Sequence, residues 1–289
     1  MKHEPFLSAT TTTVATVVLG PADFRSIADI LRAEARISLG EGKINLVQSR
    51  LARRLRECRL DNFPAYLRLV RDDAEERERM IDALTTNHTH FFREKHHFDH
   101  LRAEILPRLK ARADTGQPVR LWSAGSSSGE EIYSVAMTLA GTSPGEARWL
   151  GGDVRLLATD LSAPMVEAVA VARYPSIGAD QVPLPYRAAW LQSEGGEVAV
   201  DPRLRALVTA RPLNLFAPWP FRGQFDVIFC RNVMIYFDAD ARASLEARLV
   251  AQLRPGGTLY IGHSERLSRT VAARVQSCGQ TIYRKPEGA

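Results

Sequence analysis

Four short apolar runs, separated by segments of helical periodicity, constrain the fold of this chain more than any other feature. The runs are VRLWS (119–123), VRLLAT (154–159), FDVIFC (225–230) and TLYIG (258–262). Runs that are apolar on both faces are typical of parallel strands covered by helices on both sides of a sheet. Helices are expected at residues 130–140, 163–172 and 239–253, the last two after the capping residues Ser162 and Asp238. The alternation predicts an open, doubly wound α/β sheet.

Residues 21–84 have a different pattern, in which apolar side chains recur only at helical spacing. Leu51 and Leu55 lie one helical turn apart, as do Ile27 and Leu31, and no alternating strand pattern interrupts them. The region is therefore predicted to be a small helical domain. A connector is expected at residues 85–95, and the α/β domain at residues 96–289.

The first 20 residues are predicted to be a flexible tail. TTTTVATVVL (10–19) is partly apolar, but it is rich in threonine and lacks the cleavage pattern of a secretion signal. No stretch approaches the roughly 20 consecutive apolar residues of a membrane span. The three cysteines are far apart and form no CxxC pair, which argues against a disulfide framework and a thiolate zinc site. These features predict a cytoplasmic protein that does not insert into a membrane.

One interval, at about residues 173–210, breaks the alternation of strands and helices. It contains polar turns and brief β-like runs such as GEVAV (196–200). An inserted antiparallel β-subdomain is expected there. The alternative, an irregular connection, is uncommon at this length.

A glycine- and serine-rich turn (124–129) follows the first strand and leads into a helix that starts with Glu130 and Glu131. Doubly wound sheets bind nucleotides at this place, but the GxGxxG spacing is absent and two glutamates would repel a pyrophosphate. S-adenosylmethionine has an adenosine, no phosphate and two cationic groups, so Glu131 favours it. Asp160, at the end of the second strand, can accept hydrogen bonds from its ribose. Alternatively, the glutamates only complement the helix dipole and Asp160 only caps a helix, although Ser162 is better placed for that.

Three longer segments, supported by two shorter ones, carry a family resemblance. They are TTNHTHFFREKHHF (85–98), LWSAGSSSGEEIYS (121–134) and FDVIFCRNVMIYFD (225–238), with LNLF (213–216) and LRPGGTLYIGHSE (253–265). The chain resembles the chemotaxis receptor protein-glutamate O-methyltransferases of the CheR type over nearly its whole length. This resemblance implies a class I S-adenosylmethionine-dependent methyltransferase fold with an all-helical receptor-recognition domain and the inserted β-subdomain. It also implies methyl transfer to glutamate side chains of chemoreceptors, with S-adenosylhomocysteine as the second product.

The resemblance further implies roles for single residues. Arg93 and Tyr236 are the implied catalytic pair at the substrate carboxylate. A glutamate with a pKa of roughly 4.3 is already ionised at neutral pH, so the reaction requires alignment and desolvation rather than a base. Without the resemblance, Arg93 is a solvated connector residue and Tyr236 a core aromatic. The implied cofactor-binding residues are Asn87, Thr89, Arg93, Gly125, Glu131, Asp160, Asn214, Leu215, Arg231 and Asn232.

A cluster of histidines at residues 88–100 raises the question of a metal site. His96 and His100 are one helical turn apart, but no nearby cysteine completes a ligand set and the HExxH glutamate is missing. A surface cluster or pocket wall is expected instead. S-adenosylmethionine is thus the predicted cofactor, with no metal.

Basic residues suggest how a partner is recognised. The net charge is +5 and arginines crowd residues 50–59, which by itself suits nucleic acid, an anionic membrane surface or an acidic protein. Arg53 and Arg56 point away from the apolar face of this helix, and Arg50 and Arg59 flank them. The face is predicted to dock on glutamate-rich methylation helices of chemoreceptors, the alternative being a solvated surface.

The β-insertion bears on a second receptor contact. In the family, it can bind a pentapeptide at the C-terminus of some receptors. LQSEGGEVAV (191–200) lacks the Gly-x-Pro turn of those members, so an enzyme independent of that tether is expected.

Sequence features disfavour two other functions. A nucleic-acid methyltransferase of the amino-methylating kind carries an Asn/Asp-Pro-Pro-aromatic turn where this chain has CRNVMIYF (230–237), and residues 50–59 lack aromatics between the arginines. No nucleic-acid partner is therefore expected. An inactive cofactor-binding module is disfavoured because Arg93 and Tyr236 are both present.

Overall fold

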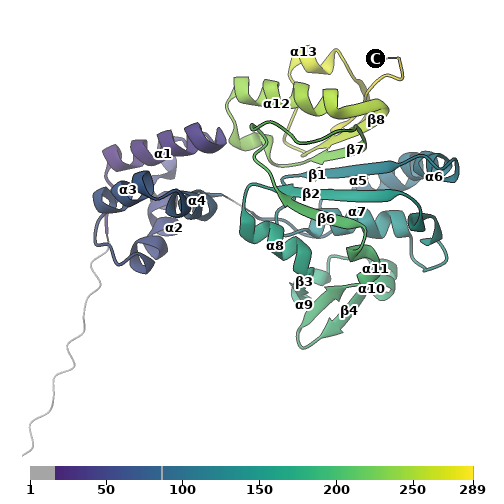
Figure 1. Ribbon diagram of the computed structural model, residues 1–289, viewed down its shortest axis with the longest axis horizontal. Helices are drawn as coiled ribbons and strands as arrows, with labels where there is room; N and C mark the ends of the chain where they lie inside the picture. Colours follow the sequence, from purple (N-terminus) through teal and green to yellow (C-terminus); the bar gives the residue numbers. More distant parts are fainter. Residues whose placement is uncertain (1–16, 86, 289) are drawn as a thin grey trace, which may run out of the picture. The chain divides into compact units, whose positions relative to one another are not determined.

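The computed structural model describes residues 17–85 and 87–288. The chain forms two compact units (Figure 1). One contains the described residues up to Leu31 together with Leu39–Thr85, and the other contains Arg32–Ser38 and the chain from Thr86 onward. Helix α1 (Pro21–Ala35) therefore contributes its last turn to the second unit. Within the described ranges, every helix is too short or too polar to span a bilayer.

The first unit is all-helical, as the periodicity predicted. After α1 it contains the short 3-10 helix η1 (Glu41–Lys43), α2 (Ile44–Glu57), α3 (Phe63–Asp72) and α4 (Ala74–Leu84). Asn62 caps α3 through the Ala65 N–H, and Asp73 caps α4 through the Glu75 N–H. Its buried apolar side chains are Leu19, Phe24, Ile27, Leu31, Val47, Leu51, Leu55, Phe63, Tyr66, Leu67, Val70, Met80, Ile81 and Leu84.

The expected tail of residues 1–20 falls mostly outside the described residues, which begin at Val17. Its end, however, belongs to the helical unit. Leu19 is buried, and its N–H donates a hydrogen bond of 2.8 Å to Oε1 of Gln48. The last residues of the predicted tail are therefore packed against the helical unit, although a single buried leucine before a helix leaves no periodic signal in the sequence.

The second unit contains a seven-stranded sheet in the order β6-β2-β1-β7-β8-β10-β9. The four predicted strands are β1 (Val119–Ala124), β2 (Val154–Asp160), β7 (Phe225–Cys230) and β8 (Leu253–Ile261), joined by β6 (Val208–Pro212), β9 (Gln276–Gly279) and β10 (Ile282–Arg284). All neighbours from β6 to β8 are parallel, whereas β10 is antiparallel to both β8 and β9. Because the strand order reverses between β1 and β7, the carboxyl ends of these two strands flank the crevice in which such sheets bind ligands.

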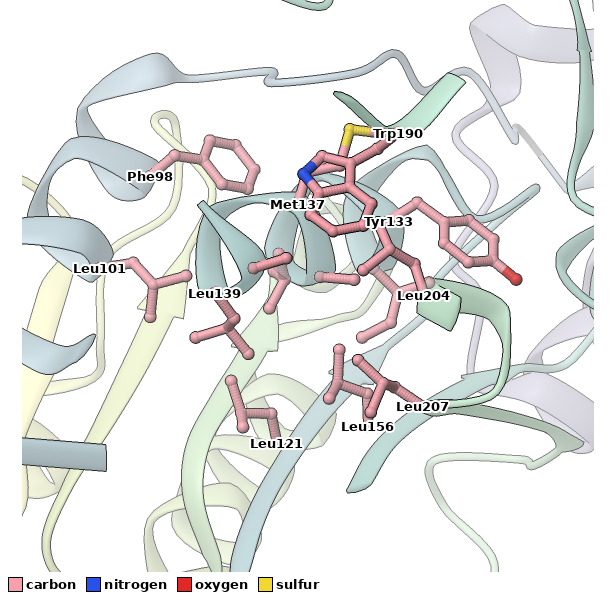
Figure 2. Close-up of a cluster of buried hydrophobic side chains, with 14 of the residues drawn as sticks. Phe98, Leu101, Leu121, Tyr133, Met137, Leu139, Leu156, Trp190, Leu204 and Leu207 are labelled. Atoms are coloured by element: carbon pink, nitrogen blue, oxygen red, sulfur yellow. The ribbon is translucent and has the colours of Figure 1, made fainter. Parts of the chain in front are cut away.

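Helices cover both faces of this sheet. The covering elements are α5 (Lys95–His100), the π-helical turn η2 (Leu101–Ile105), α6 (Leu106–Asp114), α7 (Glu130–Ala140), η3 (Arg148–Gly151), α8 (Ala163–Val171), η4 (Met234–Tyr236), α12 (Ala239–Gln252) and α13 (Arg269–Ala272). Figure 1 shows α12 and α13 on one side and α7 on the other. Alternate strand residues point to opposite faces. Leu121 therefore packs in the core that includes Met137 of α7 (Figure 2), whereas Trp122 packs in the core that includes Leu249 of α12.

The last predicted strand begins earlier than its apolar run TLYIG (258–262) indicated. α12 ends at Gln252 and β8 begins at Leu253, so LRPGG is part of β8. Gly256 has a φ of 74°, and the register with β7 shifts between Phe225 and Val227. A bulge of this kind lets the strand bend while it stays paired.

The insertion between α8 and β6 is a small antiparallel sheet, as expected. Its strands β3 (Arg173–Pro175), β4 (Leu191–Glu194) and β5 (Glu197–Val200) have the order β3-β5-β4, with helices α9 (Ser176–Ala179), α10 (Leu184–Trp190) and α11 (Pro202–Arg205). β4 and β5 are joined by Gly195 and Gly196, both at positive φ, in a tight hairpin. Independence from a receptor tether stays a prediction.

Candidate active site

The candidate site lies at the edge of the sheet where β1, β2 and β7 end. Ala124 of β1 pairs with Thr159 of β2, and Ser123 of β1 pairs with Phe229 of β7. The loops that follow these strands therefore leave the sheet side by side. Half of the cofactor-binding residues predicted from the sequence lie in these loops, at a strand end or in the first turn of α7, namely Gly125, Glu131, Asp160, Arg231 and Asn232.

The turn after β1 keeps its backbone close to neighbouring elements. Gly125 has a φ of 78°, and a Cβ there would lie 2.5 Å from Cγ2 of Val233. Gly129 has a φ of 102°, and a Cβ there would lie 2.8 Å from the hydroxyl of Tyr174. Only glycine combines this conformation with this closeness, so the turn has no room for side chains at either position.

Asp160 is held by the same turn. Its Oδ2 accepts the Ser127 N–H at 2.8 Å, and its Oδ1 accepts the Ser162 N–H at 3.0 Å. Burial raises the pKa of Asp160, and these hydrogen bonds oppose that shift. Ser162 occupies the N-cap position of α8 as expected, but its hydroxyl accepts no N–H of the first turn, so the expected side-chain cap is absent. The N–H groups of Ser127, Leu161 and Ser162 use three of the roughly four lone-pair sites of this carboxylate, which leaves Asp160 able to accept a ribose hydroxyl.

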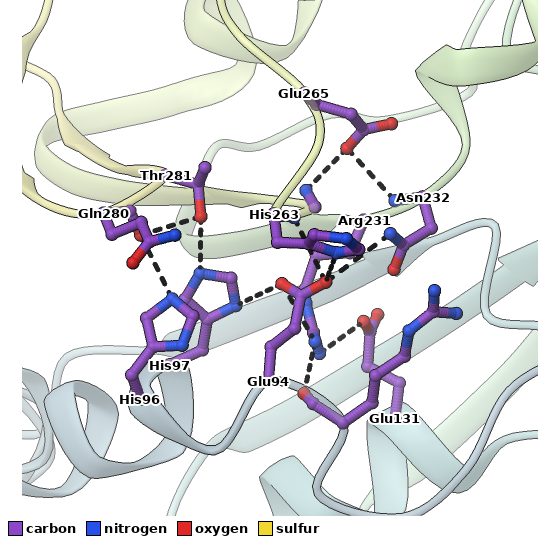
Figure 3. Close-up of polar contacts among 12 residues, drawn as sticks. Glu94, His96, His97, Glu131, Arg231, Asn232, His263, Glu265, Gln280 and Thr281 are labelled. Atoms are coloured by element: carbon purple, nitrogen blue, oxygen red, sulfur yellow. Dashed lines mark hydrogen bonds and ion pairs between the residues drawn. The ribbon is translucent and has the colours of Figure 1, made fainter.

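Arg231 joins two acidic side chains at the end of β7 (Figure 3). Its Nη1 donates to Oε2 of Glu131 at 3.1 Å, and its Nη2 lies 3.4 Å from Oε2 of Glu94. Its side chain is only 2% exposed, and it also donates to the carbonyl of Arg93. Burial raises the pKa of Glu131, while Arg231 and a 2.6 Å hydrogen bond from the Ser123 hydroxyl oppose the shift.

Glu94 was not among the residues predicted from the sequence, although it lies within the FFRE segment. It has a left-handed φ of 60° and accepts hydrogen bonds from the N–H and Nδ1 of His263 at 3.1 and 2.9 Å. Burial alone would raise its pKa, but Arg231 and His263 hold the pKa at about 2. Glu94, Arg231 and Glu131 together carry two carboxylates and one guanidinium, so this edge has an excess of negative charge.

Glu265 is a second buried acid that sequence reasoning missed. It accepts the N–H of Asn232 at 3.1 Å and the N–H of Met234 at 2.8 Å. Burial raises the pKa of Glu265, and these backbone bonds lower it. Asn232 itself has a φ of 59°, and the bonds to Glu265 fix this unusual turn between Arg231 and η4. The GHSE segment contains Glu265, but its burial leaves no trace in sequence spacing.

The other predicted site residues have contacts of different kinds. Asn87 accepts the Ser127 hydroxyl on its carbonyl at 2.7 Å, which ties the connector to the glycine-rich turn. Thr89 and Tyr236 are half-buried, and Arg93 is half-exposed with Nη1 3.1 Å from the His88 carbonyl. Asn214 uses both ends of its amide for backbone groups, those of Phe216 and Glu34, and Leu215 is buried in the α12 core.

The histidines of α5 lie against β8 and the turn before β10. Nε2 of His97 is 2.9 Å from the Thr281 hydroxyl, and Nδ1 of His100 is 2.8 Å from the Tyr260 hydroxyl. Nε2 of His96 is 3.2 Å from the carbonyl of Gln280. In the part of the chain that the structure describes, no group of three or more His, Cys, Asp or Glu residues is arranged to hold a metal.

The buried His97 predicts how stability depends on pH. Burial and the nearby Arg231 lower its pKa from 6.5 to about 3. The unfolded chain therefore takes up a proton near pH 6.5 that the folded chain takes up only near 3. The free energy of unfolding therefore has its highest value above about pH 6.5. It falls as the pH drops from about 6.5 towards 3, by up to about 1.4 kcal/mol per pH unit.

His97→Gln is expected to remove most of this slope. Urea unfolding between about pH 7 and 4 measures it, with tryptophan fluorescence as the signal because all four tryptophans lie in the second unit. His88→Gln, at an exposed position in the connector before α5, is the control and keeps the wild-type slope. Equal slopes in the two variants would contradict the assignment to His97.

Comparisons with known proteins agree with this geometry. Residues 22–85 match the family model of the CheR methyltransferase all-alpha domain, and residues 87–284 match that of the CheR methyltransferase SAM-binding domain. The chain belongs to the CheR methyltransferase family. It is 41% identical to a probable chemotaxis protein methyltransferase of Rhizobium etli, covering 88% of this chain and 96% of the relative. It is 40% identical to chemotaxis protein methyltransferase 2 of Pseudomonas aeruginosa (90% and 92% covered) and 38% identical to the chemotaxis protein methyltransferase of Escherichia coli (92% and 92%).

The residues at this edge fit the S-adenosylmethionine of a CheR methyltransferase. Asp160 offers carboxylate oxygens at the strand ends, beside the glycine-rich turn. The excess negative charge of Glu94 and Glu131 over Arg231 suits a cationic cofactor. When bound, this cofactor supplies an electrophilic methyl group, and the residues of the CheR fold would align that group with the substrate.

Proposed function

We propose that this methyltransferase esterifies glutamate side chains on the cytoplasmic methylation helices of chemoreceptors. Methyl esters and S-adenosylhomocysteine are the products. The observation that supports this most is the pairing of Arg231 with both Glu94 and Glu131. These buried acids beside the strand ends are occupied by ion pairs and do not act as a base, and a substrate that is already an ionised carboxylate needs none. The relatives in Rhizobium etli, Pseudomonas aeruginosa and Escherichia coli are all named chemotaxis protein methyltransferases, which agrees with a chemoreceptor substrate.

The proposed reaction requires positioning and no proton abstraction. A glutamate carboxylate is ionised at neutral pH and is itself the nucleophile. Glu94 and Glu131 are paired with Arg231, and Glu265 accepts backbone N–H groups, so these three acids serve the structure and the cofactor. Arg93 would fix the substrate carboxylate through its guanidinium, and the Tyr236 hydroxyl would orient one oxygen.

The cofactor-binding assignment belongs to the same proposal. Glu131 would face the cationic amino-acid end of the cofactor and Asp160 its ribose. The remaining residues of the set are Asn87, Thr89, Arg93, Gly125, Asn214, Leu215, Arg231 and Asn232.

Methyl transfer to receptor-containing membranes tests the product class. With a labelled methyl group on the cofactor, the label is expected in the receptor and is expected to leave as volatile methanol under mild alkali. Carboxyl esters are alkali-labile, whereas methylated amines and nucleobases are stable. Arg93→Ala in place of the wild-type enzyme provides the enzyme-dependence control. A label that stays on the receptor in alkali would refute glutamate esterification.

The receptor is proposed to dock on the basic surface of α2. Arg53, Arg56 and Arg59 are exposed there, and Arg53 pairs with Glu57 at 2.7 Å. Arg50 is half-buried and donates to the carbonyls at the end of α4, with distances of 2.7 and 3.1 Å. Its main contribution to docking would therefore be to hold α2 against α4, while the three exposed arginines attract the acidic helices.

Charge reversal tests this docking surface. Arg53→Glu combined with Arg56→Glu is expected to raise the KM for receptor membranes roughly ten-fold, with kcat little changed, because long-range attraction becomes repulsion. The same reversal at the exposed Arg68 and Arg71 of α3 is the matched control. Initial rates at several receptor and salt concentrations measure the effect. Equal KM values in both double variants would rule out α2 as the docking surface.

A further inference from the structure

The segment Arg32–Ser38 reaches the catalytic unit from a distant part of the sequence. α1 ends at Ala35, and Arg36 has a φ of 58°, so the chain reverses direction there. This segment belongs to the second unit, although the residues on both sides of it belong to the first. It therefore touches the methyltransferase fold without being adjacent to it in sequence.

The segment pairs with the loop that contains Tyr236. The Ser38 N–H donates to the carbonyl of Tyr236 at 2.8 Å. Ile37 and Phe237 form an antiparallel bridge next to this bond. The pairing resembles a short strand added to the loop, and it fixes the backbone at the position from which the Tyr236 side chain leaves.

Two further contacts connect the segment with the same region. Arg32 lies 3.4 Å from Asp238, the residue that caps α12, but both side chains are substantially exposed and the pair contributes little. The carbonyl of Glu34 accepts the amide of Asn214 at 2.8 Å. Ile37 packs against the core that contains Phe237, so apolar contact supports the hydrogen bonds.

The Tyr236 loop is thus held at both of its ends. Upstream, Glu265 accepts the N–H of Met234 at 2.8 Å. Downstream, Ser38 binds the carbonyl of Tyr236. The upstream contact comes from the catalytic fold itself, whereas the downstream contact comes from the end of α1.

We propose that Arg32–Ser38 is a positioning segment of the methyltransferase, which sets the backbone of Tyr236 so that its hydroxyl meets the substrate carboxylate. This inference rests on the proposed role of Tyr236. Ser38 acts through its N–H and Ile37 through its bridge to Phe237, and neither touches the cofactor edge at Glu131 or Asp160. Ser38 and Ile37 are therefore expected to affect turnover of substrate and to leave cofactor binding unchanged, whereas Glu34 of the same segment binds the amide of Asn214.

Ser38→Pro in the full chain removes the N–H, and Ile37 before it is already in the extended conformation that precedes proline. The kcat for receptor methylation is expected to fall about ten-fold, the equivalent of one lost hydrogen bond, while the Kd for S-adenosylmethionine stays within about two-fold. Ile37→Ala is expected to shift kcat in the same direction. Gly40→Pro, at a φ of −73° and with nothing within 4 Å of the added Cβ, is the matched control and keeps the wild-type kcat.

Tyr236→Phe separates this inference from the proposed function. If Tyr236→Phe keeps the wild-type kcat, the proposed role of Tyr236 fails, and the positioning role fails with it. If Tyr236→Phe lowers kcat while Ser38→Pro and Ile37→Ala do not, only the positioning role fails. In the double variant, Ser38→Pro is expected to add less than about two-fold to the loss caused by Tyr236→Phe. Fully additive losses, or a loss of cofactor binding in Ile37→Ala, would also overturn the proposal.

Discussion

Replacing Glu131 by glutamine is expected to weaken S-adenosylmethionine binding roughly 100-fold, the size of a charge-assisted hydrogen bond in a buried site. The substitution is nearly isosteric and keeps an acceptor for the Ser123 hydroxyl. It removes one of the two carboxylates that give the strand edge its excess negative charge. Titration calorimetry with the purified enzyme measures the change.

Glu130→Gln is the matched control, because Glu130 lies in the same first turn of α7 and hydrogen-bonds the Ser128 hydroxyl at 2.6 Å. It is expected to change the affinity less than about two-fold, as is usual for a surface substitution. Similar losses in both variants would show that the general negative charge of the first turn of α7, and not the buried carboxylate of Glu131, attracts the cofactor.

The pH dependence of cofactor affinity provides a second readout of Glu131. Burial raises the pKa of Glu131 above its usual value of 4.5 in the free enzyme. A cationic ligand binds the ionised form of this carboxylate. The affinity for S-adenosylmethionine is therefore highest at pH values well above the raised pKa and falls as the pH drops towards it. The decline therefore begins at a higher pH than an ordinary glutamate would give, and Glu131→Gln is expected to flatten it.

Replacing Arg231 by methionine is expected to destabilise the catalytic unit by about 3–5 kcal/mol, because two buried carboxylates lose their shared partner. Glu94 and Glu131 are only 9% and 12% exposed, so water compensates little of this loss. Urea unfolding monitored by tryptophan fluorescence reports on this unit. Arg222→Met, at an exposed position, is the control, with an expected change below about 0.5 kcal/mol.

A second substitution tests whether repulsion between the carboxylates is the cause. Glu94→Gln added to Arg231→Met is expected to recover part of the lost stability, because one of the two unpaired charges is then absent. Without any recovery, the destabilisation would have to come from lost packing around the long Arg231 side chain, which also lies over the ring of Phe98.

The strands and most helices follow from local patterns in the sequence. β7 is buried at every residue, which agrees with its continuous apolar run, and α12 begins after Asp238 as the capping pattern predicted. The short strands β9 and β10 have mixed burial and no clear alternation. β10 is a strand because β8 offers it a pairing edge, a condition that no local window contains, and β9 in turn pairs with β10.

The acids of the site also fall into two groups, those whose place local sequence patterns predict and those whose place depends on the tertiary structure. The positions of Asp160 and Glu131 at one edge of the sheet could be predicted. In a doubly wound sheet, the ends of parallel strands and the start of the next helix meet at this edge. The roles of Glu94 and Glu265 could not be predicted, because they depend on burial next to Arg231 and on N–H groups of a distant turn. A glutamate in a polar segment is usually exposed, and sequence spacing does not distinguish the exception.

The sequence by itself determined the two-part organisation, the doubly wound sheet and the place of the cofactor turn, because hydrophobic periodicity and glycine positions act over a few neighbouring residues. Only the tertiary structure decided that Asp160 accepts the N–H of Ser127, that Arg231 holds two acids, and that Ser38 supports Tyr236. These contacts join residues up to 198 positions apart, from Ser38 to Tyr236. Their stability comes from burial and charge pairing, which exist only once the chain has folded.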